Sequence, residues 1–168
     1  GVQTCALPIF SVVSARGIMR EADPERFEVL PLGITRGGAW LTPEETRRRL
    51  ERVERGETRD LGDEPATGVL ANSDVVTALR SIDAAFPIVH GTFGEDGTMQ
   101  GLLEMAEVPY VGPGVAASAA GMDKALMRAA FAASGVPQAR YLVLRDDELP
   151  EGGAVSTNVG RRVEREIG

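Results

Sequence analysis

Short runs of β-forming residues alternate with helical patterns along most of the chain, and this alternation limits the fold more than any other feature. The runs typical of strands span residues 26–35 (RFEVLPLGIT), 68–71, 86–90 (FPIVH), 109–111 and 140–144. Strands separated by helices form βαβ units, because a parallel strand needs a long crossover connection. We therefore expect an α/β fold built on a mostly parallel sheet.

Helical patterns fill the segments between these runs. Helices are expected over residues 11–22, 43–55, 74–82, 98–107 and 122–134, with a final helix that carries Val155, Val159, Val163 and Ile167. The helix over 43–55 has a clear start, since Thr42 can cap its N-terminus and Pro43 is favoured at the first helical position. These signals predict where the helices begin and say less about the sheet.

Composition excludes several classes of protein. The chain has 168 residues, of which 43% are hydrophobic and 26% charged, which is the balance of a globular protein. Its net charge of −7 leaves no broad basic surface, so we expect no nucleic-acid partner. We see neither a signal peptide nor a run near the roughly 20 apolar residues that cross a bilayer. We therefore expect no membrane partner and a cytoplasmic location.

The rarest residue types limit the chemistry further. With one cysteine, Cys5, and one histidine, His90, the chain cannot assemble a disulfide framework or a Cys/His zinc site. We assign no metal ligand. No serine can be placed beside His90 as a nucleophile, and neither a GxGxxG nor a Walker pattern occurs around it. Among the 18 basic residues, Lys124 is the only lysine.

One loop concentrates the residues that could bind a ligand. It reads HGTFGEDG and contains His90, Gly91, Gly94, Glu95, Asp96 and Gly97. Ligands in open α/β sheets bind beyond the carboxyl ends of strands, and glycines let the backbone approach them closely. A purely structural interpretation also fits, in which the histidine is hydrogen-bonded at a strand end and the two acids cap the next helix. The residues alone leave both interpretations open.

Several segments give the chain a family resemblance. They read HGTFGEDGTMQG from residue 90, PYVGPGVAAS from residue 109, MDK at 122–124 and SVVSARGIMREADPERFEVLPLGIT at 11–35. Together they resemble the D-alanine:D-alanine ligase family of ATP-grasp enzymes. The resemblance implies a parallel-sheet, Rossmann-like preATP-grasp domain over residues 11–120, followed by the truncated start of an ATP-grasp domain over 121–168.

The resemblance also implies an activity and a set of site residues. Such a ligase joins two D-alanines for peptidoglycan, using ATP and Mg²⁺, through a D-alanyl phosphate. By position in the family pattern, His90 and Gly91 line the site of the first D-alanine. The residues that shape this pocket or support the residues lining it are Gly94, Glu95, Asp96 and Gly97. Lys124 contacts an ATP phosphate. A lysine suits that role because its ammonium is a compact point charge. None of these residues is expected to be catalytic.

The ends of the chain depart from the family pattern. Residues 1–10, GVQTCALPIF, stand where the family has a strand and a glycine-rich loop with a substrate-binding acid, and we expect this segment to be non-native and adapter-derived. The family's catalytic tyrosine, serine and arginine and its Mg²⁺ ligands have no counterpart up to Gly168. We therefore expect a fragment that is inactive alone. Family members are commonly dimers, so a homodimer is also implied.

Two alternatives remain at this point. One is a non-catalytic α/β module that binds a small ligand. The other is a ligase that uses a different acceptor, such as D-serine or D-lactate, since the residues that choose the acceptor have no counterpart in the sequence.

Overall fold

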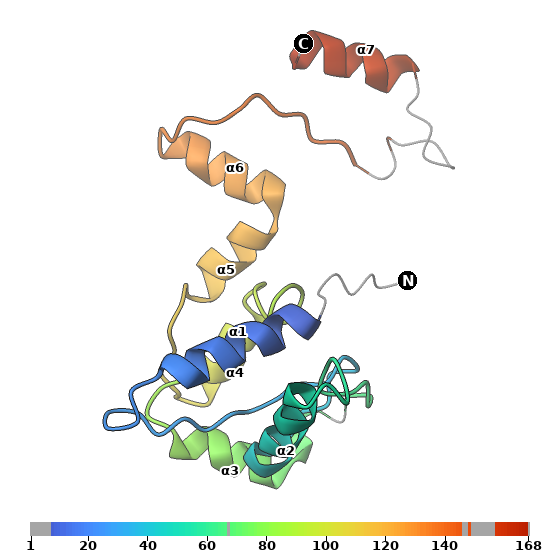
Figure 1. Cartoon of the computed structure of the whole chain (residues 1–168). Coiled ribbons are helices and arrows are strands. Elements are labelled where there is room, and N and C mark those ends of the chain that lie inside the picture. The colour runs from blue at the N-terminus through green and yellow to red at the C-terminus, as the bar shows by residue number, and fades with distance from the viewer. Residues whose placement is uncertain (1–7, 67, 146–147, 149–156, 168) are drawn as a thin grey trace. The chain divides into compact units, whose positions relative to one another are not determined.

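The computed structural model describes residues 8–66, 68–145, 148 and 157–167 (Figure 1). Its elements are α1 (Pro8–Glu21), α2 (Pro43–Glu54), the short 3₁₀ helix η1 (Val69–Ala71), α3 (Ser73–Ser81), α4 (Thr98–Met105), α5 (Val115–Met122), α6 (Lys124–Ala133) and α7 (Thr157–Glu166). The chain divides into two compact units, residues 1–119 and 120–168, here called the first and second unit. The sequence placed a domain boundary after residue 120, and the assignment of the two parts to named domains stays a prediction.

Helices α2, α3 and α4 begin at or next to their predicted starts. The Thr42 hydroxyl accepts a hydrogen bond from the amide of Glu45 at 3.2 Å, and Pro43 occupies the first helical position, which confirms the expected start of α2. Helix α4 begins at Thr98 as predicted. Helix α3 begins one residue early, because the Asn72 side chain caps it from outside the predicted segment.

Two helices differ from the prediction: one begins earlier than expected, and the other was not predicted. Helix α1 was expected from Ser11 and begins at Pro8, so the end of the segment 1–10 is helical. Residues 1–7 lie outside the described residues. Helix α5 was not predicted, since its sequence VAASAAGM is rich in alanine, which favours helix, but has no amphipathic pattern to reveal one.

The helix predicted over 122–134 is interrupted. Helix α5 ends at Met122 and α6 begins at Lys124. Between them, Asp123 adopts an extended backbone and its carboxylate accepts hydrogen bonds from the amides of Ala125 and Leu126. An N-cap residue has non-helical backbone angles, so this cap separates the two helices.

The predicted parallel sheet is not formed in the part of the chain that the structure describes. Pairing there is limited to isolated bridges: Ile34 with Trp40 and Gly38 with Pro65, both antiparallel, and Ala85 with Tyr110, parallel. The strands predicted over 26–35, 86–90, 109–111 and 140–144 are therefore wrong as regular strands, and the segment 68–71 contains η1 instead. The parallel bridge does place the chain before Phe86 beside the chain before Val111, with the Ala85 amide 2.7 Å from the Pro109 carbonyl oxygen.

The lack of regular strand pairing among the described residues has a physical reason. A strand persists only where a neighbouring strand pairs with its backbone amides and carbonyls. Phe27 lies in the strand predicted over 26–35 and Phe86 begins the one predicted over 86–90. Their side chains are 56% and 57% exposed, so neither is buried against a neighbouring layer. The residue pattern reports a preference for strand, but it does not report whether a partner strand is available.

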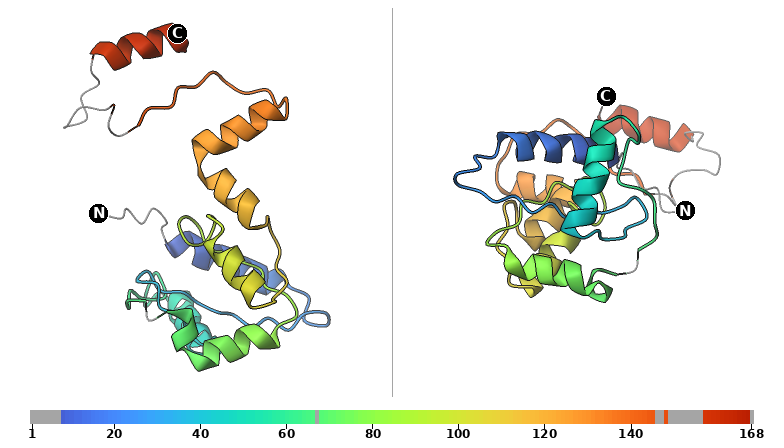
Figure 2. Two further views of the ribbon diagram at one scale, coloured as in Figure 1. Left: turned by 180° about the vertical axis from the view of Figure 1, so that it is seen from behind. Right: turned by 60° about the horizontal axis from the view of Figure 1, so that its bottom comes forward.

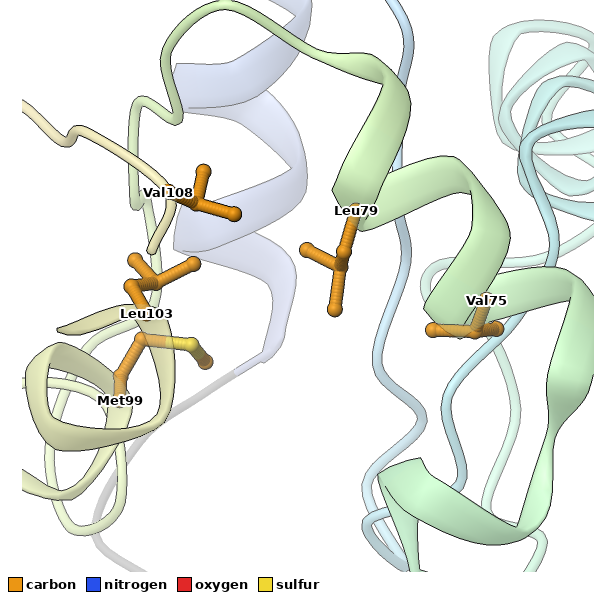
Figure 3. Close-up of a cluster of buried hydrophobic side chains, with 5 residues drawn as sticks. All are labelled: Val75, Leu79, Met99, Leu103 and Val108. Atoms are coloured by element: carbon orange, nitrogen blue, oxygen red, sulfur yellow. The ribbon is translucent and has the colours of Figure 1, made fainter. Parts of the chain in front are cut away.

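The main core of the first unit lies between α3 and α4 (Figure 3). Val75 and Leu79 on α3 face Met99 and Leu103 on α4, and Val108 joins them just after α4. Leu103 is 2% exposed. Residues three or four positions apart lie on one face of a helix, which is why each helix contributes a pair. This packing fixes the start of α4 and thereby the end of the loop over residues 90–97.

A second cluster in the same unit joins α1 to α2, whose ribbons can be followed in both views of Figure 2. Its buried members are Val12 on α1, Leu41, Leu50 on α2 and Leu61. The first unit therefore has two hydrophobic clusters of its own. Within the described residues, no helix is both long and apolar enough to cross a membrane.

The second unit contains the end of α5 together with α6 and α7. Helix α7 confirms the predicted final helix, although Val155 lies outside the described residues. Val159 on α7 is buried, whereas no side chain of α6 is. Leu126, Phe131 and Tyr141 are exposed. The described part of this unit therefore has little core.

Candidate functional site

Residues 90–97 form a closed turn between the parallel bridge and α4. The amides of Gly94 and Glu95 donate to the Gly91 carbonyl oxygen at 3.2 and 2.9 Å. In the opposite direction, the Gly91 amide donates to Glu95 Oε2 at 2.6 Å. Gly91 and Glu95 are thus joined by two hydrogen bonds of opposite polarity, which closes the loop on itself.

Asp96 connects this loop to α4. Its Oδ2 accepts from the amide of Phe93 at 2.8 Å and its Oδ1 from the amide of Thr98, the first residue of α4, at 3.0 Å. Partial burial acts to raise the pKa of Asp96, but the hydrogen bonds from Phe93 and Thr98 outweigh it, so the pKa lies below its ordinary value. The ionised carboxylate is therefore the form that holds the loop.

Two positions in the loop require glycine because the backbone is closely approached. A Cβ atom on Gly94 would lie 2.6 Å from the carbonyl oxygen of Val89. Gly97 has a φ of +94° and caps α4, and a Cβ atom there would lie 2.8 Å from the carbonyl oxygen of Val115. Phe93 also has a positive φ, 67°, which is uncommon for a non-glycine residue and marks a constrained turn.

His90 stands at the solvent edge of the loop. Its Nδ1 lies 3.7 Å from Glu95 Oε1, and the side chains of His90 and Glu95 are 45% and 54% exposed. The imidazole is therefore held near a carboxylate without being covered. A ligand that reached the loop would meet the imidazole and the glycine-rich backbone together.

Gln100 belongs to this arrangement, although the sequence did not single it out. It is 6% exposed, and its Nε2 donates to the Gly94 carbonyl oxygen at 3.1 Å. Its Oε1 is buried without a hydrogen-bond partner among the described residues. A signal was available, since a glutamine next to Met99 on the buried side of α4 needs a polar partner.

Lys124 belongs to the second unit, whereas the loop belongs to the first. It is the first residue of α6 in the second unit, its side chain is exposed, and no ion pair to it is found in the described part of the chain. The structure thus brings His90, Gly91, Gly94, Glu95, Asp96 and Gly97 together in one loop of the first unit, and places Lys124 in the other unit. Among the residues described, no group of three or more His, Cys, Asp or Glu side chains could hold a metal ion.

Comparison with known proteins gives a consistent set of relatives. The family model described as "D-ala D-ala ligase N-terminus" matches residues 9–113, which include the whole loop and exclude Lys124. A D-alanine–D-alanine ligase of Nocardia farcinica is 45% identical over 145 residues, covering 80% of this chain and 40% of the relative. The corresponding ligase of Geobacillus thermodenitrificans is 40% identical over 167 residues, covering 94% and 44%.

A solved structure agrees with these sequence relatives. The D-alanine–D-alanine ligase of Coxiella burnetii has a TM-score of 0.65 and 30% identity, and the match covers 93% of this chain and 45% of that one. This likeness is consistent with an α/β domain of the kind found at the N-terminus of such ligases. The chain spans about two fifths of the length of the curated relatives it matches.

Proposed function

The chain belongs to the D-alanine–D-alanine ligase family, in the part named for the ligase N-terminus, and from this premise we propose that it contributes the first D-alanine site of a ligase that joins two D-alanines with ATP. The observation that carries the proposal is the loop over residues 90–97. It lies wholly within the matched residues and presents a half-exposed imidazole on a backbone that two carboxylates hold in place.

The proposed roles follow from this geometry. His90 and Gly91 lie at the open side of the loop, where they can contact the amino acid. Gly94, Glu95, Asp96 and Gly97 fix the backbone behind them through the close approaches and hydrogen bonds described above. A loop held in one conformation can bind a ligand without a further ordering cost. None of these residues has to form or break a bond.

Phosphoryl transfer explains why such a reaction uses ATP. An amide does not form at useful rates from a free carboxylate. Conversion of the carboxylate of the first D-alanine to an acyl phosphate provides phosphate as a leaving group, which the amine of the second D-alanine can displace. Lys124 fits a phosphate contact, because its ammonium is exposed and pairs with no carboxylate in the described part of the chain. We assign no residue of this chain to Mg²⁺.

Further parts of the proposal concern the longer protein. They are the role in peptidoglycan synthesis, the cytoplasmic location, the ATP-grasp character of residues 121–168 and a homodimer. They follow from family membership alone.

The test is phosphate release from ATP in the presence of D-alanine. It compares the 168-residue chain with the longer reading frame that contains it, and includes D-serine and D-lactate as acceptors. We expect turnover with D-alanine by the longer protein and none by residues 1–168, which correspond to two fifths of the relatives. A folded longer protein without turnover would defeat the ligase proposal, and turnover by the short chain would defeat its expected inactivity.

A further inference from the structure

We propose that Glu95 is a positioning residue for His90, keeping the proton of the neutral imidazole on Nδ1 and presenting Nε2 to the ligand. The inference deepens the proposed function, because it concerns the same D-alanine site. It adds what the family match does not give, namely which imidazole nitrogen faces the ligand and which residue decides it.

The two oxygens of Glu95 have separate tasks. Oε2 accepts the amide hydrogen of Gly91 at 2.6 Å, and Oε1 lies 3.7 Å from Nδ1 of His90. The backbone amide of Glu95 is itself bound to the Gly91 carbonyl oxygen at 2.9 Å. The carboxylate therefore cannot turn away from the imidazole without breaking the hydrogen bond that closes the loop.

Electrostatics then selects the tautomer. In a neutral imidazole one nitrogen carries a hydrogen and the other a lone pair. A lone pair on Nδ1 would face the negative Glu95 oxygen and be repelled, whereas an N–H bond there is attracted. The proton consequently favours Nδ1, and Nε2 remains as a hydrogen-bond acceptor. An acceptor at this position is matched to a donor on the ligand, such as the ammonium group of an amino acid.

Neighbouring acids do not compete for this role. Both oxygens of Asp96 are already occupied, one by the amide of Phe93 and one by the amide of Thr98. Glu95 is therefore the carboxylate of this loop that faces the histidine. A glutamine in its place has a single acceptor oxygen, which cannot serve both the Gly91 amide and the His90 ring.

Nitrogen-15 NMR of the imidazole can test this directly, because His90 is the only histidine in the chain and its ring signals need no assignment. The ratio of Nδ1–H to Nε2–H tautomer is measured on the ligand-free 168-residue chain, at a pH high enough for the ring to be neutral. The same chain in urea serves as the reference without the Glu95 contact. We expect the ratio to be higher in the folded chain by up to about fivefold, because the effect of the strongest exposed ion pairs is an upper limit for a neutral ring beside a carboxylate.

Two variants assign this shift to its cause. Glu95→Gln is expected to return the ratio toward the urea value. Glu25→Gln removes an equal charge at an exposed position with no described side-chain partner, and is expected to leave the ratio unchanged. Equal ratios in the folded and urea-unfolded wild-type chain would overturn the proposal, whatever the variants do. So would a ratio that Glu95→Gln leaves unchanged while Trp40 fluorescence shows the variant to be folded.

A final arm separates this proposal from the proposed function. D-alanine is added to the wild-type chain and the His90 signals are followed. Movement of Nε2 rather than Nδ1 supports the proposal, and movement of Nδ1 alone contradicts it. Absence of any movement counts against D-alanine binding by this chain and leaves the tautomer result to stand by itself.

Discussion

The two units of this chain use similar helices but differ in what those helices pack against. In the first unit, α3 and α4 bury Val75, Leu79 and Leu103 against one another, and a second cluster joins α1 to α2. In the second unit, no side chain of α6 is buried. The difference teaches that helix signals in the sequence do not by themselves provide a core. Among the described residues, packing that fixes a loop in one conformation is found in the first unit.

A matched pair of aspartates makes the contrast specific. Asp96 binds the amide of Thr98 at the start of α4, and Asp123 binds the amides of Ala125 and Leu126 at the start of α6. The local chemistry is the same in both places. Helix α4, however, continues into the core through Met99 and Leu103, so Asp96 connects its loop to packing that Asp123 lacks.

The largest expected effect is on the core itself. Leu103→Ala should lower the free energy of unfolding by about 2–5 kcal/mol, because Leu103 is fully buried and its removal leaves a cavity. Urea unfolding followed by Trp40 fluorescence measures this, since Trp40 packs against the same cluster. Leu126→Ala in the second unit, followed by the Tyr141 ring signals in proton NMR during urea unfolding, is the matched control and should cost less than about 0.5 kcal/mol. Equal losses would show that the second unit has a comparable core.

The next effect concerns backbone conformation. Gly97→Ala should cost about 1–3 kcal/mol. Alanine would have to adopt the left-handed backbone of this position, and its Cβ would meet the Val115 carbonyl. Gly121→Ala, near the end of α5, meets no atom within 4 Å and has no positive φ, so it should be neutral or stabilising by up to about 1 kcal/mol. The urea-unfolding midpoints of the two variants test both expected changes in stability. A harmless Gly97→Ala would mean that the loop is not held as described.

Part of this architecture could be read from the sequence. Thr42 and Pro43 predicted the start of α2, and α4 begins at its predicted residue, Thr98, because caps and helical periodicity are local. The sheet was not predictable in the same way. Phe86 to His90 has the composition of a strand, yet pairing depends on distant backbone that no local pattern reports.

The candidate site, too, was predictable from the sequence only in part. The glycines and acids of the loop were visible in the sequence, and so was the position of His90 before a helix. Which atoms they contact was not, since the bond from Gly91 to Glu95 and the burial of Gln100 arise from the turn that Phe93 and Gly97 make. The roles assigned to His90 and Lys124 stay predictions.

The two helix-capping aspartates, Asp96 and Asp123, offer a test with a smaller effect that depends on pH. Asp96→Asn should cost about 1 kcal/mol near neutral pH, because the amide has one acceptor oxygen where the carboxylate uses two. Asp123→Asn should leave the unfolding of the first unit unchanged. The folded-state pKa of Asp96 lies below its ordinary value of 3.8, so its stabilisation is present above that pH and is lost as the pH falls below it. The difference between wild type and Asp96→Asn should therefore shrink when urea unfolding is repeated at about pH 3.

The smallest expected effect lies in the second unit, where Arg128 attaches the segment after α6. Its guanidinium carbon lies 4.7 Å from the centre of the Tyr141 ring, and its Nη1 donates to the Ala139 carbonyl oxygen at 3.2 Å. Arg128→Met keeps an apolar side chain but removes both contacts, at an expected local cost of about 0.5–1 kcal/mol. The ring signals of Tyr141 in proton NMR should then move toward their urea-unfolded positions.

The same variant decides whether the two units unfold independently. Trp40 lies in the first unit, so its unfolding midpoint should stay at the wild-type value in Arg128→Met. Arg26→Met is the control in the first unit, since Arg26 lies 5.3 Å from the centre of the exposed Phe27 ring and should leave the Tyr141 signals in place. A lower Trp40 midpoint in Arg128→Met would mean that the second unit supports the core of the first. The loop at His90 would then depend on residues beyond 119, and the contrast between the two units would no longer hold.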